Sequence, residues 1–226
     1  MPSGCTGGIV AVMSGCCDPS GYGRVFNAEQ AARAVRNFER KGLDGTARPM
    51  VAALRSRGFT GATLLEVGAG PGTGLVTLLE AGAAGAVAYD ISPSYAEIAG
   101  ALLAGRGLSD RVEWHTGDYL ASGDTRDADV VFLNRVVCCY PDMAPLVDAA
   151  AARTRRLLAL AYPRNRWFVR AGVKVINVFL RLRRVAFRVF VHDPGAIDQR
   201  VAAAGLEEVA SGATATWQWK VWERAG

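Results

Sequence analysis

Short apolar runs alternate with amphipathic segments along most of the chain after residue 60. Runs of this length, rich in Val, Leu and Ala and bounded by glycine or polar residues, predict strands that are buried on both faces. The segments between them carry apolar residues at helical spacing, and this alternation indicates an α/β domain with a mainly parallel sheet. We expect strands at 63–67, 86–90, 111–115, 129–134 and 156–162, and helices at 74–82, 93–105, 143–153 and 194–204.

Two helices precede this alternation, and two strands close the chain. The first helix follows Asn27, a suitable N-cap residue, and ends at Gly42, while the second spans about 48–57. Residues 1–20 are rich in Gly, Ser, Cys and Pro without helical periodicity, which predicts a loop. The closing strands are expected at 206–212 and 214–223, because TWQWKVWER alternates as a half-buried strand does.

The stretch from Thr63 to Asp90, TLLEVGAGPGTGLVTLLEAGAAGAVAYD, carries the main functional signal. It predicts a strand, a glycine turn, a helix and a second strand that ends on an acid, which is a mononucleotide-binding unit. Glycines let the backbone turn tightly and approach a ligand closely. A carboxylate at the tip of the second strand can accept hydrogen bonds from both ribose hydroxyls.

The spacing of the glycines distinguishes between cofactors. A dinucleotide-binding turn has the pattern GxGxxG, whereas Glu66 is followed here by the GxGxG of Gly68, Gly70 and Gly72. This motif resembles the first motif of the class I S-adenosylmethionine-dependent methyltransferases. The resemblance implies S-adenosylmethionine as the cofactor, with the glycine turn beneath it and Glu66 near its amino-acid end. An ordinary tight turn is the alternative, and the combination with Asp90 argues against it.

Polar residues after the other strands extend the expected cofactor site, because ligands of open α/β sheets bind at the carboxyl ends of the strands. Asp118 matches the family position whose side chain bonds the adenine amino group, and a turn-forming role in its Gly-Asp pair is the alternative. Asn134 and Arg135 follow the fourth strand, where the family closes over the methionine part of the cofactor. The expected cofactor-binding residues are Glu66, Gly68, Gly70, Gly72, Asp90, Ile91, Asp118, Tyr119, Asn134 and Arg135.

A narrower resemblance extends from about residue 22 to the end of the chain. Short motifs are similar to those of the magnesium-protoporphyrin O-methyltransferases and their bacterial relatives. These motifs are Val25-Phe26-Asn27, Lys41-Gly42 with Thr46, Asp90-Ile91-Ser92, Tyr140-Pro141, Tyr162-Pro163-Arg164 and Arg188-Val189-Phe190-Val191-His192. The sequence departs from that family at Cys138 and Cys139, where isoleucine and histidine are expected, and in a longer, more basic helical insert. The resemblance therefore implies the methyltransferase class and not the porphyrin substrate.

The expected architecture is a Rossmann-like, doubly wound, seven-stranded sheet with an antiparallel last strand. A length of 226 residues suffices for one such domain with a full core. We expect an N-terminal lead-in and lid helices over 1–57, the methyltransferase domain over 58–226, and within it a helical cap insert at about 165–190.

Charge is distributed unevenly around this insert. The net charge is +5, and the interval between Asp148 and Asp193 holds eleven Lys and Arg residues and no acid. The segment WFVRAGVKVINVFLRLRRVAF within it is too short and too charged to span a bilayer. It predicts a cap that pairs guanidinium groups with an acidic substrate, contact with an anionic membrane surface, or a solvated cationic face. No aromatic-basic recognition module is found, so we expect no nucleic-acid partner.

The five cysteines form no CxxC pair, so no metal site is expected and free thiols are the default. The pairs Cys16-Cys17 and Cys138-Cys139 could gather a soft metal or a thiophilic substrate, but buried cysteine usually packs as a small apolar residue. The first residues lack a basic start and are broken by glycine. We therefore expect no signal peptide, and a cytoplasmic location.

The acceptor side needs groups that hold a nucleophile in line with the sulfonium, exclude water and in some cases remove a proton. His192 follows the insert and is a candidate base, with a packed or capping histidine as the alternative. Tyr140 could position the substrate or face the sulfonium through its ring. We expect His192 and Tyr140 to be catalytic, and the following residues to bind substrate: Tyr22, Phe26, Cys139 and Arg164.

The predicted function is methyl transfer from S-adenosylmethionine to a small or medium organic acceptor, at an oxygen of an acidic substrate. An enzyme that cyclises or cleaves the cofactor would carry the same cofactor motifs. A non-catalytic cofactor-binding or membrane-surface protein is the third alternative. The sequence gives no indication of the oligomeric state.

Overall fold

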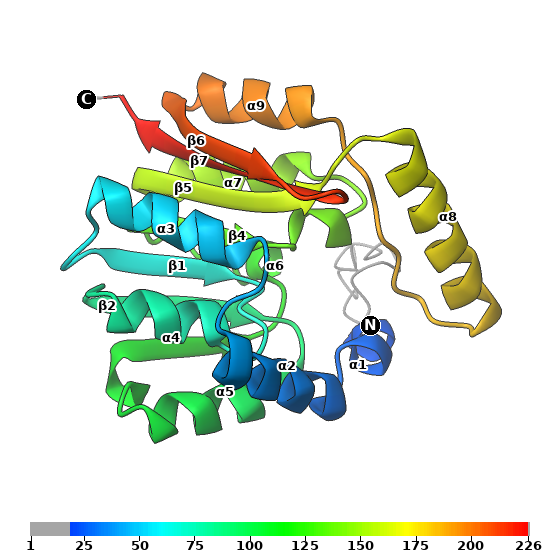
Figure 1. The fold of residues 1–226 in the computed structure, drawn as a ribbon, viewed down its shortest axis with the longest axis horizontal. Coiled ribbons are helices and arrows are strands. Elements are labelled where there is room, and N and C mark those ends of the chain that lie inside the picture. Colours follow the sequence, from blue (N-terminus) through cyan, green and yellow to red (C-terminus); the bar gives the residue numbers. More distant parts are fainter. Residues whose placement is uncertain (1–18, 226) are drawn as a thin grey trace, which may run out of the picture.

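Seven strands form a single sheet at the centre of the molecule (Figure 1). The computed structural model describes residues 19–225. The strand order is β3-β2-β1-β4-β5-β7-β6, with β7 antiparallel to both of its neighbours and the other neighbouring pairs parallel. The strands are β1 (Thr63–Val67), β2 (Gly85–Asp90), β3 (Val112–Thr116), β4 (Ala128–Asn134), β5 (Thr154–Pro163), β6 (Leu206–Ala213) and β7 (Trp217–Arg224). The expected Rossmann-like sheet with an antiparallel last strand is confirmed.

Helices cover both faces of this sheet. Successive strand residues point to opposite faces, so Leu64 of β1 belongs to one apolar cluster and Leu65 to the other. The first face is covered by α3 (Ala47–Arg57), α4 (Thr73–Glu80) and α5 (Pro93–Gly105). The second is covered by α6 (Tyr119–Ser122), α7 (Ala144–Arg153) and α9 (Pro194–Ala203).

The N-terminal part of the described chain contains three helices. A helix that the sequence did not predict, α1 (Pro19–Val25), begins inside the region expected to be a loop. Its sequence PSGYGRV has two glycines and little helix propensity. It is held instead by packing, because the Tyr22 ring lies 5.1 Å from that of Phe187. The expectation of a loop is therefore wrong for Pro19 and Ser20, and residues 1–18 lie outside the described residues.

The second and third helices agree with the prediction. In α2 (Ala28–Lys41), Asn27 is the N-cap and its side chain accepts a hydrogen bond from the Gln30 N–H at 3.0 Å, and Gly42 follows the last turn. α2 packs against α5, whereas α3 places Met50 and Leu54 in the sheet core. The boundary at residue 57 between lid helices and methyltransferase domain stays a prediction.

The helical insert stands apart from the layers. α8 (Trp167–Leu182) projects beyond the carboxyl end of β5, and the segment after it returns past α1 to α9 (Figure 1). Val185 and Phe187 of the returning segment pack with Tyr22 in a third apolar cluster. Among residues 19–225, no helix has the length and apolar character needed to cross a membrane.

The chain order reverses where β1 lies between β2 and β4, and open α/β sheets bind ligands at such a point. The carboxyl ends of β1, β2 and β4 meet there.

Candidate active site

The glycine turn after β1 adopts the backbone conformation that its sequence predicts. Gly68, Gly70 and Gly72 have φ values of 69°, 58° and 79°, in the left-handed region that side chains disfavour. A Cβ atom on Gly68 would also lie 2.2 Å from Cγ2 of Val136. The turn therefore requires glycine both for its backbone shape and for its fit against the loop after β4.

Asp90 at the end of β2 is fixed by the same turn. Its Oδ2 accepts a hydrogen bond from the Gly70 N–H and its Oδ1 one from the Ser92 N–H, each at 2.8 Å. Asp90 is 8% exposed. Burial raises the pKa of the Asp90 carboxyl above its ordinary value, although the two N–H donors oppose this. Each oxygen retains a second lone pair, so the carboxylate can still accept bonds from a pair of hydroxyl groups.

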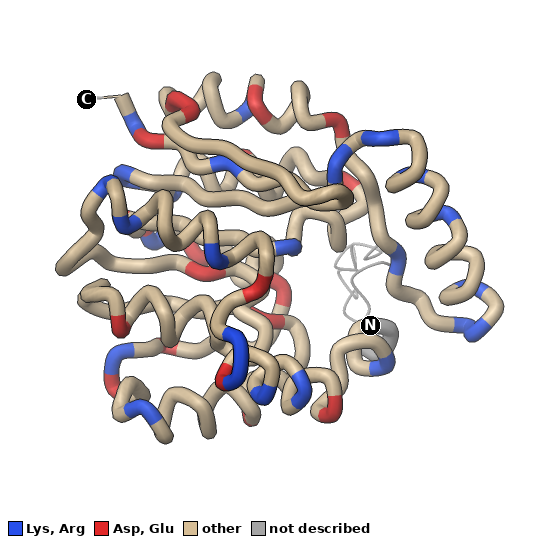
Figure 2. The backbone as a smooth tube through the Cα atoms, in the orientation of Figure 1, with Lys and Arg blue, Asp and Glu red and all other residues tan. Residues whose placement is uncertain are grey.

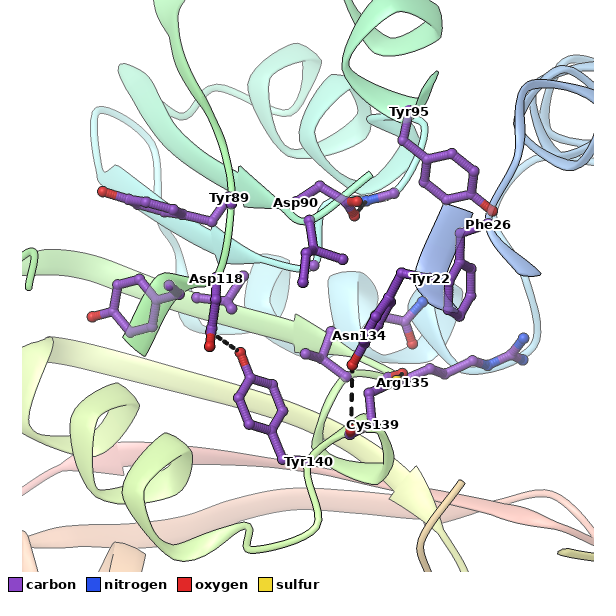
Figure 3. A pocket seen from close by; sticks show the side chains of 17 residues that line it. Tyr22, Phe26, Tyr89, Asp90, Tyr95, Asp118, Asn134, Arg135, Cys139 and Tyr140 are labelled. Carbon is purple, nitrogen blue, oxygen red and sulfur yellow. Dashed lines mark hydrogen bonds between the residues drawn. The ribbon is translucent and has the colours of Figure 1, made fainter. Parts of the chain in front are cut away.

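A pocket opens at the carboxyl ends of the parallel strands, as Figure 3 shows. Of the residues expected to bind the cofactor, eight line it: Gly68, Gly70, Asp90, Ile91, Asp118, Tyr119, Asn134 and Arg135. Of those expected on the acceptor side, four line it: Tyr22, Phe26, Cys139 and Tyr140. The sequence prediction missed several lining residues, among them Tyr95, Gly117 and Val136.

Asp118 and Tyr140 meet at one end of this pocket (Figure 3). The Tyr140 hydroxyl donates to Asp118 Oδ1 at 2.5 Å, and the Leu120 N–H donates to the same oxygen at 3.1 Å. Asp118 is also the N-cap of α6. Asp118 therefore caps α6, as the turn-forming alternative predicts, and it also lines the pocket; its contact with the adenine amino group stays a prediction.

Asn134 and Arg135 are tied to the loop between α2 and α3. The Thr46 hydroxyl lies 2.7 Å from Asp44 Oδ1 and 2.8 Å from Asn134 Oδ1, and it accepts a bond from Arg135 Nε at 3.0 Å. The Asn134 Nδ2 group donates to Asp44 Oδ2 at 3.1 Å. The guanidinium carbon of Arg135 lies 4.8 Å from the ring centroid of Trp217. Asp44, which the sequence did not single out, thus anchors both residues.

The charge of Asp44 is maintained by its donors. Burial acts to raise the pKa of the Asp44 carboxyl, but the Ala47 N–H, the Thr46 hydroxyl and Arg135 together hold it below its ordinary value. The carboxylate is therefore ionised at neutral pH and opposes the positive charge of Arg135. Arg135 itself has φ of 64°, which is rare for a residue with a side chain and marks a position fixed by its surroundings.

Comparison with known families indicates which class of domain contains this pocket. Residues 64–159, from β1 into β5, match a family described as "Methyltransferase domain". This match identifies residues 64–159 as a methyltransferase domain. The sequence has no match among curated proteins.

Solved structures resemble this methyltransferase in fold. Magnesium protoporphyrin IX methyltransferase from Synechocystis PCC 6803 with bound SAH superposes with a TM-score of 0.70 at 19% identity, over 92% of this chain and 100% of that chain. Geranyl diphosphate C-methyltransferase from Streptomyces coelicolor A3(2), in complex with Mg²⁺, geranyl diphosphate and S-adenosyl-L-homocysteine, has a TM-score of 0.64 at 12% identity. In that superposition, 92% of this chain and 88% of that chain are covered. At such identities the similarity concerns the fold.

The pocket residues of the methyltransferase fit S-adenosylmethionine. The turn at Gly68 and Gly70 brings bare backbone to the pocket wall, and Asp90 offers a fixed carboxylate beside it. Asp118 has one carboxylate oxygen without a hydrogen bond among the described residues. These carboxylate acceptors therefore match a ligand that donates from two adjacent hydroxyls and an amino group.

Two residues of the predicted cofactor set do not line the pocket. Gly72 is the N-cap of α4, behind the turn. Glu66 is 3% exposed and lies under the first turn of α4, where its Oε1 would be 2.7 Å from a Cβ on Gly74. Burial, with a smaller contribution from the charge of Asp90, raises the pKa of Glu66 well above its ordinary value. Direct contact of these two residues with the cofactor stays a prediction.

His192 and Arg164 also lie away from the pocket wall. His192 Nε2 is 3.0 Å from the Tyr140 carbonyl oxygen, so this nitrogen carries a proton and donates it to the backbone. Burial lowers the pKa of His192, with the carbonyls of Tyr140 and Val137 opposing, and the ring is neutral at pH 7. Arg164 donates to the Thr214 carbonyl at 3.0 Å. The structure therefore does not bring either residue to the predicted acceptor site.

The neighbouring cysteines differ in their surroundings. Cys138 is buried, whereas the Cys139 side chain lines the pocket with its Sγ 3.8 Å from the Arg135 carbonyl oxygen. Among residues 19–225, no group of three or more His, Cys, Asp and Glu side chains is arranged to hold a metal ion. Cys16 and Cys17 lie outside the described residues.

Proposed function

We propose that this methyltransferase transfers the methyl group of S-adenosylmethionine to an oxygen of a small organic acceptor that carries a carboxylate. The observation that supports this proposal is the composition of the pocket beyond the cofactor residues. Tyr22, Phe26 and Cys139 give it an apolar wall, and Arg135 is the one cationic side chain among the described residues that line it.

The cofactor half of the pocket holds the electrophile in this proposal. S-adenosylmethionine supplies a methyl group that is activated by the positive sulfonium. Asp90 binds the ribose hydroxyls, and Asp118 accepts from the adenine amino group. The bare backbone of Gly68 and Gly70 permits close approach, so these residues position the cofactor and leave the methyl group toward the acceptor side.

The acceptor half is built around aromatic rings. The Phe26 ring lies 5.2 Å from that of Phe187 and 6.0 Å from that of Tyr95. The Tyr22 hydroxyl donates to the Cys139 carbonyl at 3.3 Å, which joins α1 to the loop after β4. Such a wall excludes water and favours an acceptor with an apolar body, and an aromatic ring face also stabilises a sulfonium.

Oxygen is favoured as the nucleophile because the pocket offers little help in removing a proton. No His or Lys is among the described residues that line it, and in this proposal its two carboxylates, Asp90 and Asp118, are occupied by the cofactor. An amine would have to lose a proton before it could attack. A carboxylic acid is already ionised near neutral pH and needs no base, and Arg135 can orient its carboxylate.

His192 fits this scheme as a positioning residue and not as the base. Its bond to the Tyr140 carbonyl, together with the bond from the Phe190 N–H to the Cys138 carbonyl at 2.8 Å, ties the segment after the insert to the loop after β4. That loop carries Cys139 and Tyr140 into the pocket. Loss of His192 would therefore act through the placement of Tyr140.

The experiment is a screen with purified enzyme, labelled S-adenosylmethionine and paired acceptors that differ only in bearing a carboxylate or an amine on the same apolar body. We expect transfer to the carboxylate series, with the label released by mild alkali as a methyl ester is. Arg135→Gln should raise the KM for the carboxylate, and Arg57→Gln, on the surface beside Glu223, is the matched control.

Transfer to amines or carbon would refute the oxygen assignment. Loss of S-adenosylmethionine without a methylated product would point to cleavage or cyclisation of the cofactor.

The basic helical insert supports a second proposal, contact with an anionic membrane surface. Its helix α8 carries both exposed apolar side chains and exposed cations.

A further inference from the structure

Only one side of α8 packs on the rest of residues 19–225. Val169 is the one buried residue of this helix, and Val173, Asn177 and Leu180 are half-buried. These four residues follow one another at intervals of four, four and three, which is a single stripe on a helix. Asn177 fixes the stripe, because its side chain accepts from the Val189 N–H at 2.9 Å and donates to the Val189 carbonyl at 2.8 Å.

The opposite side of α8 is apolar and exposed. Trp167, Ala171, Val175, Val178 and Leu182 form a second stripe, offset from the first by two residues and so by about 200° around the helix. The exposed fractions of its large side chains are high: Trp167 81%, Val175 69%, Val178 57% and Leu182 78%. Phe168 and Phe179 flank it at 42% and 54%. An exposed apolar stripe that faces away from the sheet domain marks a surface that contacts another molecule.

Cations form a third stripe between the other two. Arg170, Lys174 and Arg181 lie on one flank of the apolar face and are exposed, and Arg183 and Arg184 follow the helix. Within residues 19–225 every ion pair lies outside the segment 164–188. Figure 2 shows Lys and Arg along α8 without Asp or Glu beside them.

We propose that α8 docks this enzyme on an anionic membrane surface. The helix lies in the plane of the interface, with the stripe from Trp167 to Leu182 inserted at the level where headgroups meet acyl chains. Arg170, Lys174 and Arg181 contact the lipid phosphates. A helix with an apolar face, a flanking row of cations and a terminal tryptophan has the features of interfacial helices.

Charge favours lipid over a second copy of the chain as the occupant. The net charge is +5, and a twofold contact through this face would bring two all-cationic helices together. An anionic bilayer instead neutralises each cation and accepts the apolar stripe without requiring a matching shape.

Docking is coupled to the pocket by packing. The segment after α8 contributes Val185 and Phe187 to the cluster that contains Tyr22, and Tyr22 lines the pocket. Arg24 of α1 also donates to the Arg184 carbonyl at 3.4 Å. The membrane surface would thus lie close to the acceptor wall, whatever the acceptor is.

The test is flotation of the full chain with vesicles of phosphatidylcholine alone or with about one-third phosphatidylglycerol. We expect binding to the anionic vesicles alone. Each Lys or Arg near an anionic surface contributes about fivefold in affinity, so Arg170→Gln/Lys174→Gln/Arg181→Gln should bind about a hundredfold more weakly. Val175→Ser/Val178→Ser/Leu182→Ser should also lose binding, and this loss should persist at low salt. The matched control is Arg33→Gln/Arg36→Gln/Arg40→Gln on α2, which removes the same charge elsewhere.

Two further measurements separate the alternatives. Unchanged affinity for S-adenosylhomocysteine in each variant shows that the fold is retained. Quenching of tryptophan fluorescence by brominated lipid should fall in Trp167→Phe. A wild-type chain that fails to bind anionic vesicles overturns the proposal. A stable dimer that dissociates on the serine substitutions assigns the face to a second copy and overturns it as well.

Discussion

Replacing Asp90 by alanine should separate the two roles of its carboxylate. The group accepts bonds from Gly70 and Ser92 at 2.8 Å each and is 8% exposed. A hydrogen bond to a charged group contributes about 1.5–3 kcal/mol. Loss of two bonds from the ribose hydroxyls should therefore weaken S-adenosylmethionine binding by at least a hundredfold, since about 1.4 kcal/mol is tenfold.

The same substitution leaves two backbone donors without their acceptor, so it also lowers stability. Asp129 is the matched control, because its Oδ2 accepts from the N–H and the hydroxyl of Thr63 at 2.8 Å each, at the opposite end of the sheet. Calorimetric titration with S-adenosylhomocysteine and thermal melting would be measured for both variants. We expect both alanine variants to melt earlier and Asp90→Ala alone to lose cofactor affinity. Equal cofactor affinity in a folded Asp90→Ala protein would refute the ribose assignment.

Three further substitutions test the site. Gly68→Val should abolish cofactor binding, because φ of 69° and the contact with Val136 exclude a side chain; normal binding by calorimetry would show that the turn is misplaced. His192→Ala should lower kcat roughly tenfold with no change in the acidic limb of the pH–rate profile, because a positioning role acts through Tyr140; loss of that limb would restore the role of base. Glu66→Gln should stabilise the cofactor-free protein above pH 4.5 and not below it. Because the pKa of Glu66 is raised in the folded protein, the stability that the wild type has below the unfolded pKa is lost as the pH rises through the folded pKa, and the glutamine variant should not show this loss. Denaturant unfolding of both proteins at several pH values would test the direction of this difference.

The sequence alone predicts the sheet and most of the expected cofactor residues that line the pocket. Their signals are local, since strand periodicity, the GxGxG turn and the acid after β2 each lie within a short stretch. Asp44 could not be found in this way. It contacts Asn134 across 90 positions of the chain, and a single acid in a loop carries no pattern.

The acceptor side was harder to predict for a related reason. The position of His192 after the insert indicated a group beside the substrate. The orientation of its ring, however, depends on the hydrogen bond to the Tyr140 carbonyl, which no local sequence pattern reveals. The sequence of the insert combined apolar and cationic residues, yet nothing in it states which side of the helix the protein covers. Packing of Val169 and Leu180 decides that question.

Tyr140 links the two ends of the pocket in a way that affects the order of ligand binding. Its hydroxyl contacts Asp118, its carbonyl accepts from His192, and the adjoining Cys139 carbonyl accepts from Tyr22. If the adenine amino group binds Asp118 as proposed, it would alter the hydrogen bond from Tyr140 and so shift this loop, which forms part of the acceptor wall. The two ligands should therefore share a coupling free energy, and each must change the affinity of the other by the same factor. We expect an ordered kinetic scheme in which S-adenosylmethionine binds first and completes the acceptor wall of the pocket, to which the acceptor then binds.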